Sequence, residues 1–509
     1  MSATAPFARR TFGVLLHPSS LPGPEPIGTF GDEAEDFVDW LATTGAGVWQ
    51  VLPLTLTHAD GSPYFSPSAF APNPWLIDLR RLAAIGLLTP DELEAGTSGA
   101  TERVDHVAVV ERKRPLLWAA ADRFLTADHP LAEPFADWRD GAAEWLDDTC
   151  HFLARKDAEP DTAWWDWPDD LRTRRPAALS ASAAELADEI ARWSAVLFLA
   201  DHQWQQLRRR ANDVGIAVLG DIPIYVAPDS ADVWMHQDSF ELDDAGRLTA
   251  QSGCPPDYFS ETGQLWGNPI YDWAAMESDG FTWWLSRLRR TLELTDLVRI
   301  DHFRGLSAYW SVPADDTTAI DGTWEPGPGQ AFVDAVRAAF PDLPIVAEDL
   351  GELDDEVLAL RDDNDLVGMR VLQFGFDDRP PNEHHPSQLV ERSIVYTGTH
   401  DNDTLAGWWT GRSRRAKERV RLATDMPPRI GTRKAVWWLI ETALRAPSVA
   451  AVVPAQDLLA LGNDARMNLP GTTEGNWGWR LDAGALTPAV AARLREAAST
   501  AGGRGIPRS

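Results

Sequence analysis

Eight short runs of apolar and largely β-branched residues recur along this chain of 509 residues, and stretches with helical periodicity separate several of them. Continuous apolar runs of this length are typical of buried strands in parallel sheets. Eight parallel strands that alternate with helices predict a (β/α)8 TIM barrel, an α/β fold. The runs are FGVLL (12–16), GVWQVLPL (47–54), IAVLGDIPIYV (216–226), LVRID (297–301), PIVAEDL (344–350), VGMRVLQFGF (367–376), SIVYTGT (393–399) and VAAVVPAQD (449–457).

Insertions must account for much of the length, because an ordinary barrel takes about 250 residues. Residues 80–200 lack strand-like runs and are rich in Ala, Arg, Asp, Leu and Trp. We interpret them as a mainly α-helical insertion subdomain. Residues 228–296 carry Gly, Pro and Asp turns and predict a second, loop-rich insertion. No internal repeat or linker divides the chain, so residues 1–509 are interpreted as a single barrel domain. The helices expected in the first insertion lie around 111–127, 134–156 and 183–213.

Three acidic side chains follow directly on predicted strands. Asp301 lies in VRIDHFRG, Glu348 in IVAEDLG and Asp401 in VYTGTHDND. Because chemistry in a parallel barrel takes place at the carboxyl ends of the strands, we expect the three carboxylates to share one site. Any one of them alone could instead cap a helix or pair with a basic neighbour. The recurrence of the pattern three times favours a catalytic interpretation.

Asp301 and Glu348 have the surroundings expected of a retaining glycosidase pair, which needs one ionised carboxylate and one protonated carboxyl group. Arg299 lies two residues before Asp301 on the same strand, so its guanidinium is expected on the same face, where it would lower the pKa of Asp301. Glu348 follows the apolar residues Pro344 to Ala347. Burial there would raise its pKa and keep it protonated.

Asp401 belongs to the polar cluster His400 to Thr404, for which sugar binding and metal binding are both open. Asp, Asn and His can ligate a cation. However, the cluster has no glycine-turned calcium loop, and no histidine pair has the helical spacing of a zinc site. We therefore favour hydrogen bonds to sugar hydroxyls and expect no metal.

Aromatic residues provide a second indication of carbohydrate chemistry, since the chain holds 24 tryptophans. Pyranose rings stack on indole and phenol rings, although most tryptophans serve packing. The pairs at 164–165, 283–284 and 437–438 lie on helical stretches and are assigned to the core. Tyr64 in GSPYFSPSAF and Trp266 in GQLWGNP occur in polar turns and are candidates for sugar platforms.

Composition excludes several other functions. The 77 acidic and 46 basic residues give a net charge of −31, which argues against nucleic acid or an anionic membrane as partner. Two cysteines, Cys150 and Cys254, cannot build a disulfide framework, and with no export signal or membrane span evident a cytoplasmic location is expected. No glycine-rich phosphate loop or other cofactor motif occurs, so no cofactor is expected.

The motifs together resemble 4-α-glucanotransferases of the amylomaltase type, in the α-amylase group. The resemblance runs from about residue 12 to 480 in the family's order. The motifs that carry it are VRIDHFRG, VAEDLG, TGTHDNDT, GVLLHPSSLPG, WQVLPL, SPY, SAFAPNPWLIDL, GDIPIYVAPDSADVW, PPDYFSETGQLWGNPIY, GMRVLQFGF and RMNLPGTTEGNW.

The resemblance implies a barrel with insertions and without a C-terminal β-sandwich, acting on maltooligosaccharides and α-1,4-glucans with glucose as an acceptor, within maltose and glycogen metabolism. It implies that Asp301 is the nucleophile, Glu348 the general acid and base, and Asp401 the transition-state stabiliser. It also implies that residues 253–268 form an active-site loop that closes over bound glucan. The substrate-binding residues it implies are Tyr64, Asp221, Trp266, Asn268, Arg299, His302, His400 and Asn468.

Two local departures concern substrate subsites. Phe65 follows SPY where family members often carry a polar residue, and 377–393 diverges from a more usual Asn/Tyr-rich pattern. The catalytic motifs alone do not separate glucan transfer from hydrolysis, since both routes use the same carboxylates. A glucan hydrolase therefore remains an alternative. A carbohydrate-binding protein without catalysis would need the aromatic residues but not the carboxylate pair.

Overall fold

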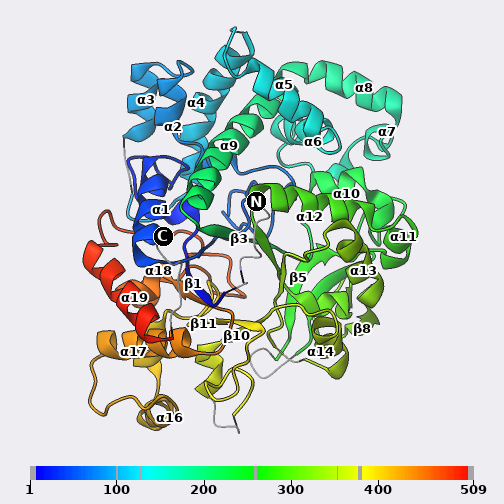
Figure 1. Ribbon diagram of the computed structural model, residues 1–509. Helices are drawn as coiled ribbons and strands as arrows, with labels where there is room; N and C mark the ends of the chain where they lie inside the picture. Colours follow the sequence, from blue (N-terminus) through cyan, green and yellow to red (C-terminus); the bar gives the residue numbers. More distant parts are fainter. Residues whose placement is uncertain are drawn as a thin grey trace.

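The chain folds into a parallel barrel that carries two insertions (Figure 1). The computed structural model describes residues 7, 9–98, 101–126, 128–256, 261–351, 353–376 and 381–502. Each of the eight predicted runs overlaps one barrel strand, so the predicted (β/α)8 fold is confirmed. The strands are β1 (Thr11–Leu15), β2 (Val48–Gln50), β3 (Ala217–Ile222), β6 (Leu297–Ile300), β9 (Ile345–Ala347), β10 (Gly368–Val371), β11 (Ser393–Tyr396) and β12 (Ala450–Pro454).

The barrel strands pair in the order β10-β11-β12-β1-β2-β3-β6-β9, and every ladder between them is parallel. The joint between β9 and β10 closes the barrel and is narrow. Among the described residues it consists of a single parallel bridge between Val346 and Val367, together with a 2.8 Å bond from the Ala347 N–H to the Val367 carbonyl oxygen.

Helices surround the barrel and cover its outer face (Figure 1). Among them, α12 buries an apolar face on which Trp284 and Leu288 are fully buried. The surrounding helices are α1 (Asp32–Thr44), α10 (Ala231–Met235), α11 (Trp273–Ser278), α12 (Thr282–Leu294), α13 (Gly329–Ala339), α14 (Asp355–Asp362), α15 (Leu405–Gly411), α16 (Arg414–Thr424), α17 (Thr432–Arg445), α18 (Ala455–Leu459) and α19 (Pro488–Thr500).

The first insertion is helical in all its regular elements among the described residues, as Figure 1 shows at its top. Its last helix, α9, continues beyond residue 200 and packs on α1 and β3, so it belongs to the barrel as well as to the insertion. The helices are α2 (Leu79–Ala84), α3 (Pro90–Thr97), α4 (His106–Thr126), α5 (Ala132–Gly141), α6 (Leu146–Ala158), α7 (Asp169–Arg172), α8 (Pro176–Glu185) and α9 (Ala187–Asp213).

The second insertion differs from the loop-rich segment that the sequence predicted. It contains strands β4 (Ala250–Cys254) and β5 (Gln264–Pro269), which form an antiparallel sheet with β7 (Ala308–Pro313) and β8 (Thr323–Pro326) in the order β5-β4-β7-β8. The expected active-site loop 253–268 is thus largely a hairpin of this sheet, and its residues 257–260 lie outside the described part. The strands were missed because Gly253, Pro255 and Gly263 resemble turn residues.

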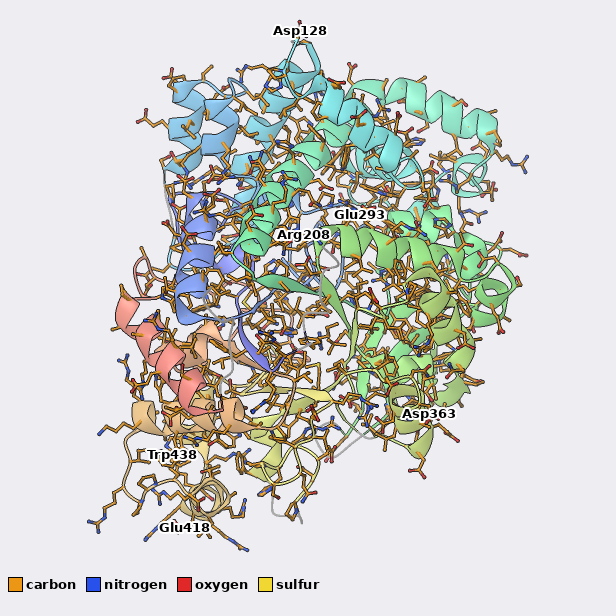
Figure 2. All side chains as sticks on the ribbon, viewed as in Figure 1. Asp128, Arg208, Glu293, Asp363, Glu418 and Trp438 are labelled. Atoms are coloured by element: carbon orange, nitrogen blue, oxygen red, sulfur yellow. The ribbon has the colours of Figure 1, made fainter. Side chains whose placement is uncertain are left out.

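Tryptophans fill much of the interior. Of the three pairs assigned to the core, Trp164, Trp283, Trp284 and Trp437 are buried, and Trp165 and Trp438 pack against the same core from its edge. Figure 2 shows how side chains crowd the space between helices and barrel, whereas the acidic side chains labelled Asp128, Asp363 and Glu418 lie at the outside. Among the described helices, none combines the length and apolar character that a membrane crossing requires. The structure contains no disulfide between Cys150 and Cys254.

Candidate active site

Asp301 directly follows β6, and an arginine of the same strand holds it. The Arg299 guanidinium forms an ion pair with Asp301 and a second one, at 2.6 Å, with Asp221 of the neighbouring strand β3. Arg299 and Asp221 are register partners in the two strands and are both buried. A buried guanidinium needs carboxylate partners, and Arg299 finds one on each side. The sequence predicted the Arg299–Asp301 contact, since the two residues share a face of the strand.

Glu348 follows β9, the strand next to β6, and backbone groups orient its carboxyl group. The His302 N–H donates to Oε2 at 2.7 Å, and the Leu350 N–H donates to Oε1 at 3.0 Å. Burial, and then the negative charge of Asp301, raise the pKa of Glu348 to about 8. The pKa rise that the apolar strand predicted is thereby confirmed, and Glu348 is protonated at neutral pH.

Asp401 lies beyond the end of β11, where the following loops hold it from two sides. Asn468 donates from Nδ2 to Oδ1 of Asp401 at 2.6 Å, and Nε2 of His400 lies 3.2 Å from the same oxygen. Arg466 donates to the Asp401 carbonyl oxygen and forms a 2.7 Å ion pair with Asp403. The carboxyl group itself remains partly exposed. It is therefore fixed in position but accessible to a ligand.

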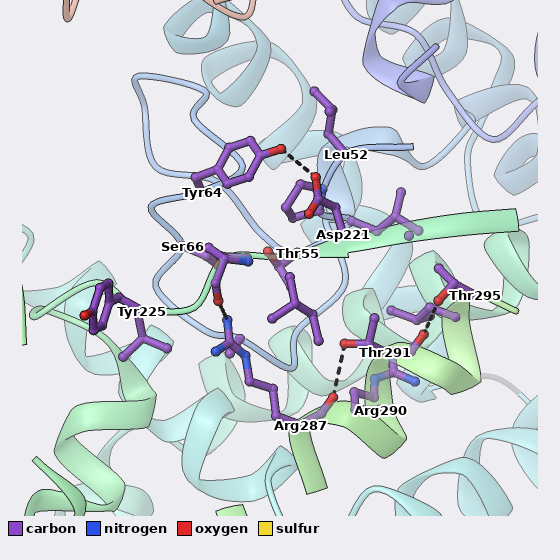
Figure 3. A pocket seen from close by; sticks show the side chains of 18 residues that line it. Leu52, Thr55, Tyr64, Ser66, Asp221, Tyr225, Arg287, Arg290, Thr291 and Thr295 are labelled. Carbon is purple, nitrogen blue, oxygen red and sulfur yellow. Dashed lines mark hydrogen bonds between the residues drawn. The ribbon is translucent and has the colours of Figure 1, made fainter. Parts of the chain in front are cut away.

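Tyr64 lies between these carboxylates. Its hydroxyl donates a 2.7 Å hydrogen bond to Oδ2 of Asp221, which Figure 3 shows as a dashed line. Its ring stacks on the imidazole of His400 with centroids 5.1 Å apart and planes within 12°, and Trp477 packs beside both rings. The ring of Tyr64 is half-buried rather than the open platform that the sequence suggested. Phe65, the next residue, turns towards His58 instead.

The β4–β5 hairpin brings Trp266 to the Glu348 side. Its indole meets the His302 ring edge-on at 4.8 Å, and His302 adopts a left-handed backbone with φ of 52° as the chain leaves β6. Asn268 lies deeper in the hairpin. It is buried, and its Nδ2 donates to the Val226 carbonyl oxygen at 2.8 Å. The structure thus brings Trp266 and His302 together with Glu348, whereas Asn268 bonds to neighbouring backbone.

The charges of the remaining polar groups follow from burial. Burial, opposed by Arg299 and reinforced by the Asp301 charge, raises the pKa of Asp221 to about 7. Burial lowers the pKa of His302 to about 4 and also lowers the pKa of His400. Both imidazoles are neutral at pH 7 and can donate or accept hydrogen bonds without adding charge. Among the described residues, no group of three or more His, Cys, Asp and Glu side chains is arranged to hold a metal ion.

Comparison with known proteins shows the family of this chain. A family model described as 4-alpha-glucanotransferase matches residues 16–487. The chain belongs to this family. It is 45% identical over 491 residues to a Thermus thermophilus 4-alpha-glucanotransferase, covering 96% of this chain and 97% of the relative, and 44% identical to the one from Synechocystis, covering 93% and 94%. The structure of Streptococcus agalactiae amylomaltase in complex with acarbose matches with a TM-score of 0.94 and 36% identity, covering 98% and 100%.

Several residues around the site of this family member were not singled out from the sequence. Arg466 and Trp477 reach Asp403, His400 and Tyr64 from a loop that lies 60 or more residues further along the chain. Asp349, the residue after Glu348, was likewise not singled out. The motif RMNLPGTTEGNW contains both loop residues, but nothing in its spacing tells which side chains turn inward. Sequence reasoning therefore found the strand-borne residues, and the family resemblance added Tyr64 and Asn468 from loops, whereas Arg466 and Trp477 were missed.

Proposed function

We propose that this chain transfers α-1,4-glucan segments between maltooligosaccharides, with Asp301 as nucleophile and Glu348 as general acid and base. One observation carries the proposal. The carboxyl groups follow adjacent strands, yet Asp301 is paired with Arg299 whereas burial and the Asp301 charge raise the pKa of Glu348 to about 8. A retaining reaction needs this contrast between an ionised and a protonated carboxyl group. Membership of the 4-alpha-glucanotransferase family supports the same reaction.

In the first half of the proposed reaction, a carboxylate oxygen of Asp301 attacks the anomeric carbon of the donor. The bond to the glycosidic oxygen breaks, and Glu348 gives its proton to that oxygen, so the shortened glucan leaves. A β-linked glucosyl ester on Asp301 remains. Asp401, held by Asn468, faces the positive charge that develops on the sugar ring and stabilises it.

In the second half, the 4-hydroxyl of an acceptor sugar enters. Glu348, now a carboxylate, removes its proton while the oxygen attacks the anomeric carbon and displaces Asp301, which restores the α-linkage. Glucose is the shortest acceptor that we propose. Water could react in the same way, so transfer requires an acceptor held in place and water kept out. Trp266, above His302, is suited to hold that acceptor.

We place this reaction in maltose and glycogen metabolism and in the cytoplasm. The cytoplasmic location rests on the two cysteines, which form no disulfide with each other and suit a reducing compartment. Detection of the native protein in the soluble cytoplasmic fraction, with none exported, would agree with it. Recovery from an extracellular fraction would contradict it.

The first test is incubation of the purified protein with maltotriose in the presence of a chelator, followed by separation of products by chain length. We expect a ladder of longer maltooligosaccharides with released glucose, while the number of reducing ends stays constant. Only shorter products with rising reducing ends would identify a hydrolase instead. No reaction at all would contradict catalysis.

Two substitutions test the assigned roles. We expect Asp301→Asn to lower transfer by about 10⁴-fold or more while maltooligosaccharides still bind, because no nucleophile remains. We expect Glu348→Gln to lose transfer from maltotriose but to retain attack on α-maltosyl fluoride, whose leaving group needs no proton. Release of fluoride with a trapped glycosyl-enzyme would identify Glu348 as the acid. Activity near wild type in either variant would remove that residue from its role.

A further inference from the structure

The narrow joint between β9 and β10 lies beside Glu348. The other seven joints of the barrel are ladders of three or more residue pairs, whereas among the described residues this joint has one bridge. Glu348 follows β9 immediately. Its backbone bonds to the β6 side, with its N–H donating to the Ile300 carbonyl oxygen and its carbonyl oxygen accepting from the Phe303 N–H, both at 3.1 Å. On the β10 side, the backbone bond nearest to Glu348 in the described part of the chain is the one from the Ala347 N–H to the Val367 carbonyl oxygen.

The side chain of Asp349 spans this joint. Oδ1 accepts the Met369 N–H of β10 at 2.6 Å, and Oδ2 accepts from Arg370 at 2.9 Å and from Arg361. The carboxylate is almost fully buried, so its charge depends on these donors. It supplies the hydrogen bonds between β9 and β10 that a longer ladder would have made.

The neighbouring glycine fits the same interpretation. A Cβ atom on Gly368 of β10 would lie 2.5 Å from Oδ2 of Asp349, which is closer than real Cβ contacts come. Only glycine therefore lets the carboxylate sit against the β10 backbone. The sequence therefore supplies two residues to one contact. They are Asp349, directly after Glu348, and Gly368, at the start of β10.

In the chain, Asp349 lies between Glu348 and Leu350, whose backbone N–H helps to orient the Glu348 carboxyl group. The N–H of Leu350, the next residue, donates to Oε1 of Glu348. On β10, the sulfur of Met369 lies 3.3 Å from Nε of Arg299, which pairs with Asp301. The hydrogen bond from the Met369 N–H to Asp349 therefore fixes the position of the turn after Glu348 relative to Arg299 and Asp301.

We propose that Asp349 is a positioning residue, which closes the barrel at β9–β10 and thereby holds Glu348 at its working distance from Asp301. The proposal rests on the function assigned to Glu348 above. Misplacement of a catalytic group by about 1 Å costs on the order of 10²-fold in rate. The effect should therefore appear in the chemical step more than in substrate binding.

The test variant is Asp349→Asn, in which an amide hydrogen donor replaces one oxygen that faces two guanidinium groups. We expect kcat with maltotriose to fall about 10- to 100-fold, while KM changes less than about threefold. The charged groups that act on Glu348 are Asp301 and Arg299 from β6 and Asp349 itself. Since the Asp349 charge raises the pKa of Glu348, the alkaline limb of the pH profile should also move to lower pH.

Asp296→Asn is the matched control. Asp296 immediately precedes β6 and likewise bonds a backbone N–H of a neighbouring strand, that of Val218, and an arginine, Arg208, each at 2.7 Å. These bonds lie at the amino-terminal end of the barrel strands, whereas Asp301 and Glu348 follow the carboxyl ends. Figure 2 labels Arg208. We expect Asp296→Asn to lower the melting temperature but to change kcat less than twofold, with an unchanged pH profile.

Gly368→Ala tests the same contact without changing charge, should Asp349→Asn fail to fold. Its methyl group would displace the Asp349 carboxylate, so kcat should fall in the same way. If the folded Asp349 or Gly368 variants match Asp296→Asn in kcat and pH profile, the positioning role is wrong. Glu348→Gln, measured in parallel, separates the two kinds of failure. Activity in that variant would overturn the catalytic assignment on which this proposal rests, whereas an inactive Glu348→Gln beside an Asp349→Asn with wild-type kcat would overturn the positioning role alone.

Discussion

The hydroxyl of Tyr64 donates its proton to Oδ2 of Asp221, and this 2.7 Å hydrogen bond joins the two halves of the site. Asp221 shares Arg299 with Asp301, whereas the ring of Tyr64 stacks on His400, whose imidazole contacts Asp401. Tyr64 therefore contacts both the group that contains Asp301 and the group that contains Asp401.

Replacing Tyr64 by Phe separates these two contacts, since the ring stays and the hydroxyl is lost. Hydrogen bonds to charged groups contribute about 1.5–3 kcal/mol, so we expect kcat/KM for maltotriose to fall about 10- to 100-fold. Tyr64→Ala should lose more, because His400 then loses its stacking partner. Wild-type kcat/KM in Tyr64→Phe would show that the Asp221 bond is dispensable.

The position of Asp401 depends on Asn468, which donates to Oδ1 at 2.6 Å. We expect Asn468→Ala to lower kcat about tenfold with little change in stability, because the carboxylate loses a hydrogen bond that holds it towards the developing charge. Asn476→Ala is the control. Asn476 belongs to the same loop, but its amide bonds Leu469 and Thr472 within that loop. Equal losses in both variants would indicate loop disruption rather than a specific role for Asn468.

Protonation of Glu348 should limit activity at alkaline pH and also couple stability to pH. Its pKa is raised from 4.5 to about 8, so the folded state binds a proton that the unfolded state releases between those values. Stability from this group is therefore complete below about pH 4.5 and is lost as the pH rises towards 8. The linkage of about 1.4 kcal/mol per pKa unit makes the loss a few kcal/mol.

Glu348→Gln removes this coupling. We expect its melting temperature to exceed that of the wild type by a margin that grows from pH 5 to pH 8, as measured by calorimetry. In the active wild type, kcat/KM should decline above about pH 8 as Glu348 ionises. A margin that shrinks with rising pH, or activity that persists unchanged to pH 10, would contradict the raised pKa.

The barrel and the strand-borne acids were predictable because they depend on local patterns. An apolar run followed by Asp301 or Glu348 determines both the strand and the end at which the acid lies. Arg299 was predictable for the same reason, since residues two apart share a face of a strand.

The supports of the site depend on contacts between distant segments, and no local pattern specifies them. Asn468, which only the family resemblance pointed to, reaches Asp401 across 67 residues, and Asp349, which nothing pointed to, reaches β10 across a turn and a helix. The small sheet pairs β4 with β7, on the far side of the β6 strand in sequence, and its glycines had indicated a loop. Gly253 and Gly263 nevertheless fit a hairpin, because at each position the backbone of the opposite strand lies too close to leave room for a side chain.

Transfer rather than hydrolysis should depend on Trp266. Its indole lies over His302 from the β4–β5 hairpin, beside the amide that orients Glu348, so an acceptor sugar stacked there would have its hydroxyl near the base. We expect Trp266→Ala to raise the ratio of hydrolysis to transfer about 3- to 10-fold, because loss of an aromatic contact of about 0.5–1.5 kcal/mol leaves the acceptor site open to water. The measurement compares glucose released with longer products formed from maltotriose, together with the increase in reducing ends.

Trp324→Ala is the control for this variant, since Trp324 is a partly exposed indole on edge strand β8 of the same sheet and packs on Trp310. It should leave the ratio of hydrolysis to transfer at the wild-type value. If both variants shift the ratio equally, the sheet as a whole excludes water. If neither does, the acceptor is held elsewhere, and the stacking role of Trp266 is wrong. A rise confined to Trp266→Ala, which added glucose at high concentration reverses, would locate the acceptor on this indole, because mass action then refills the weakened site.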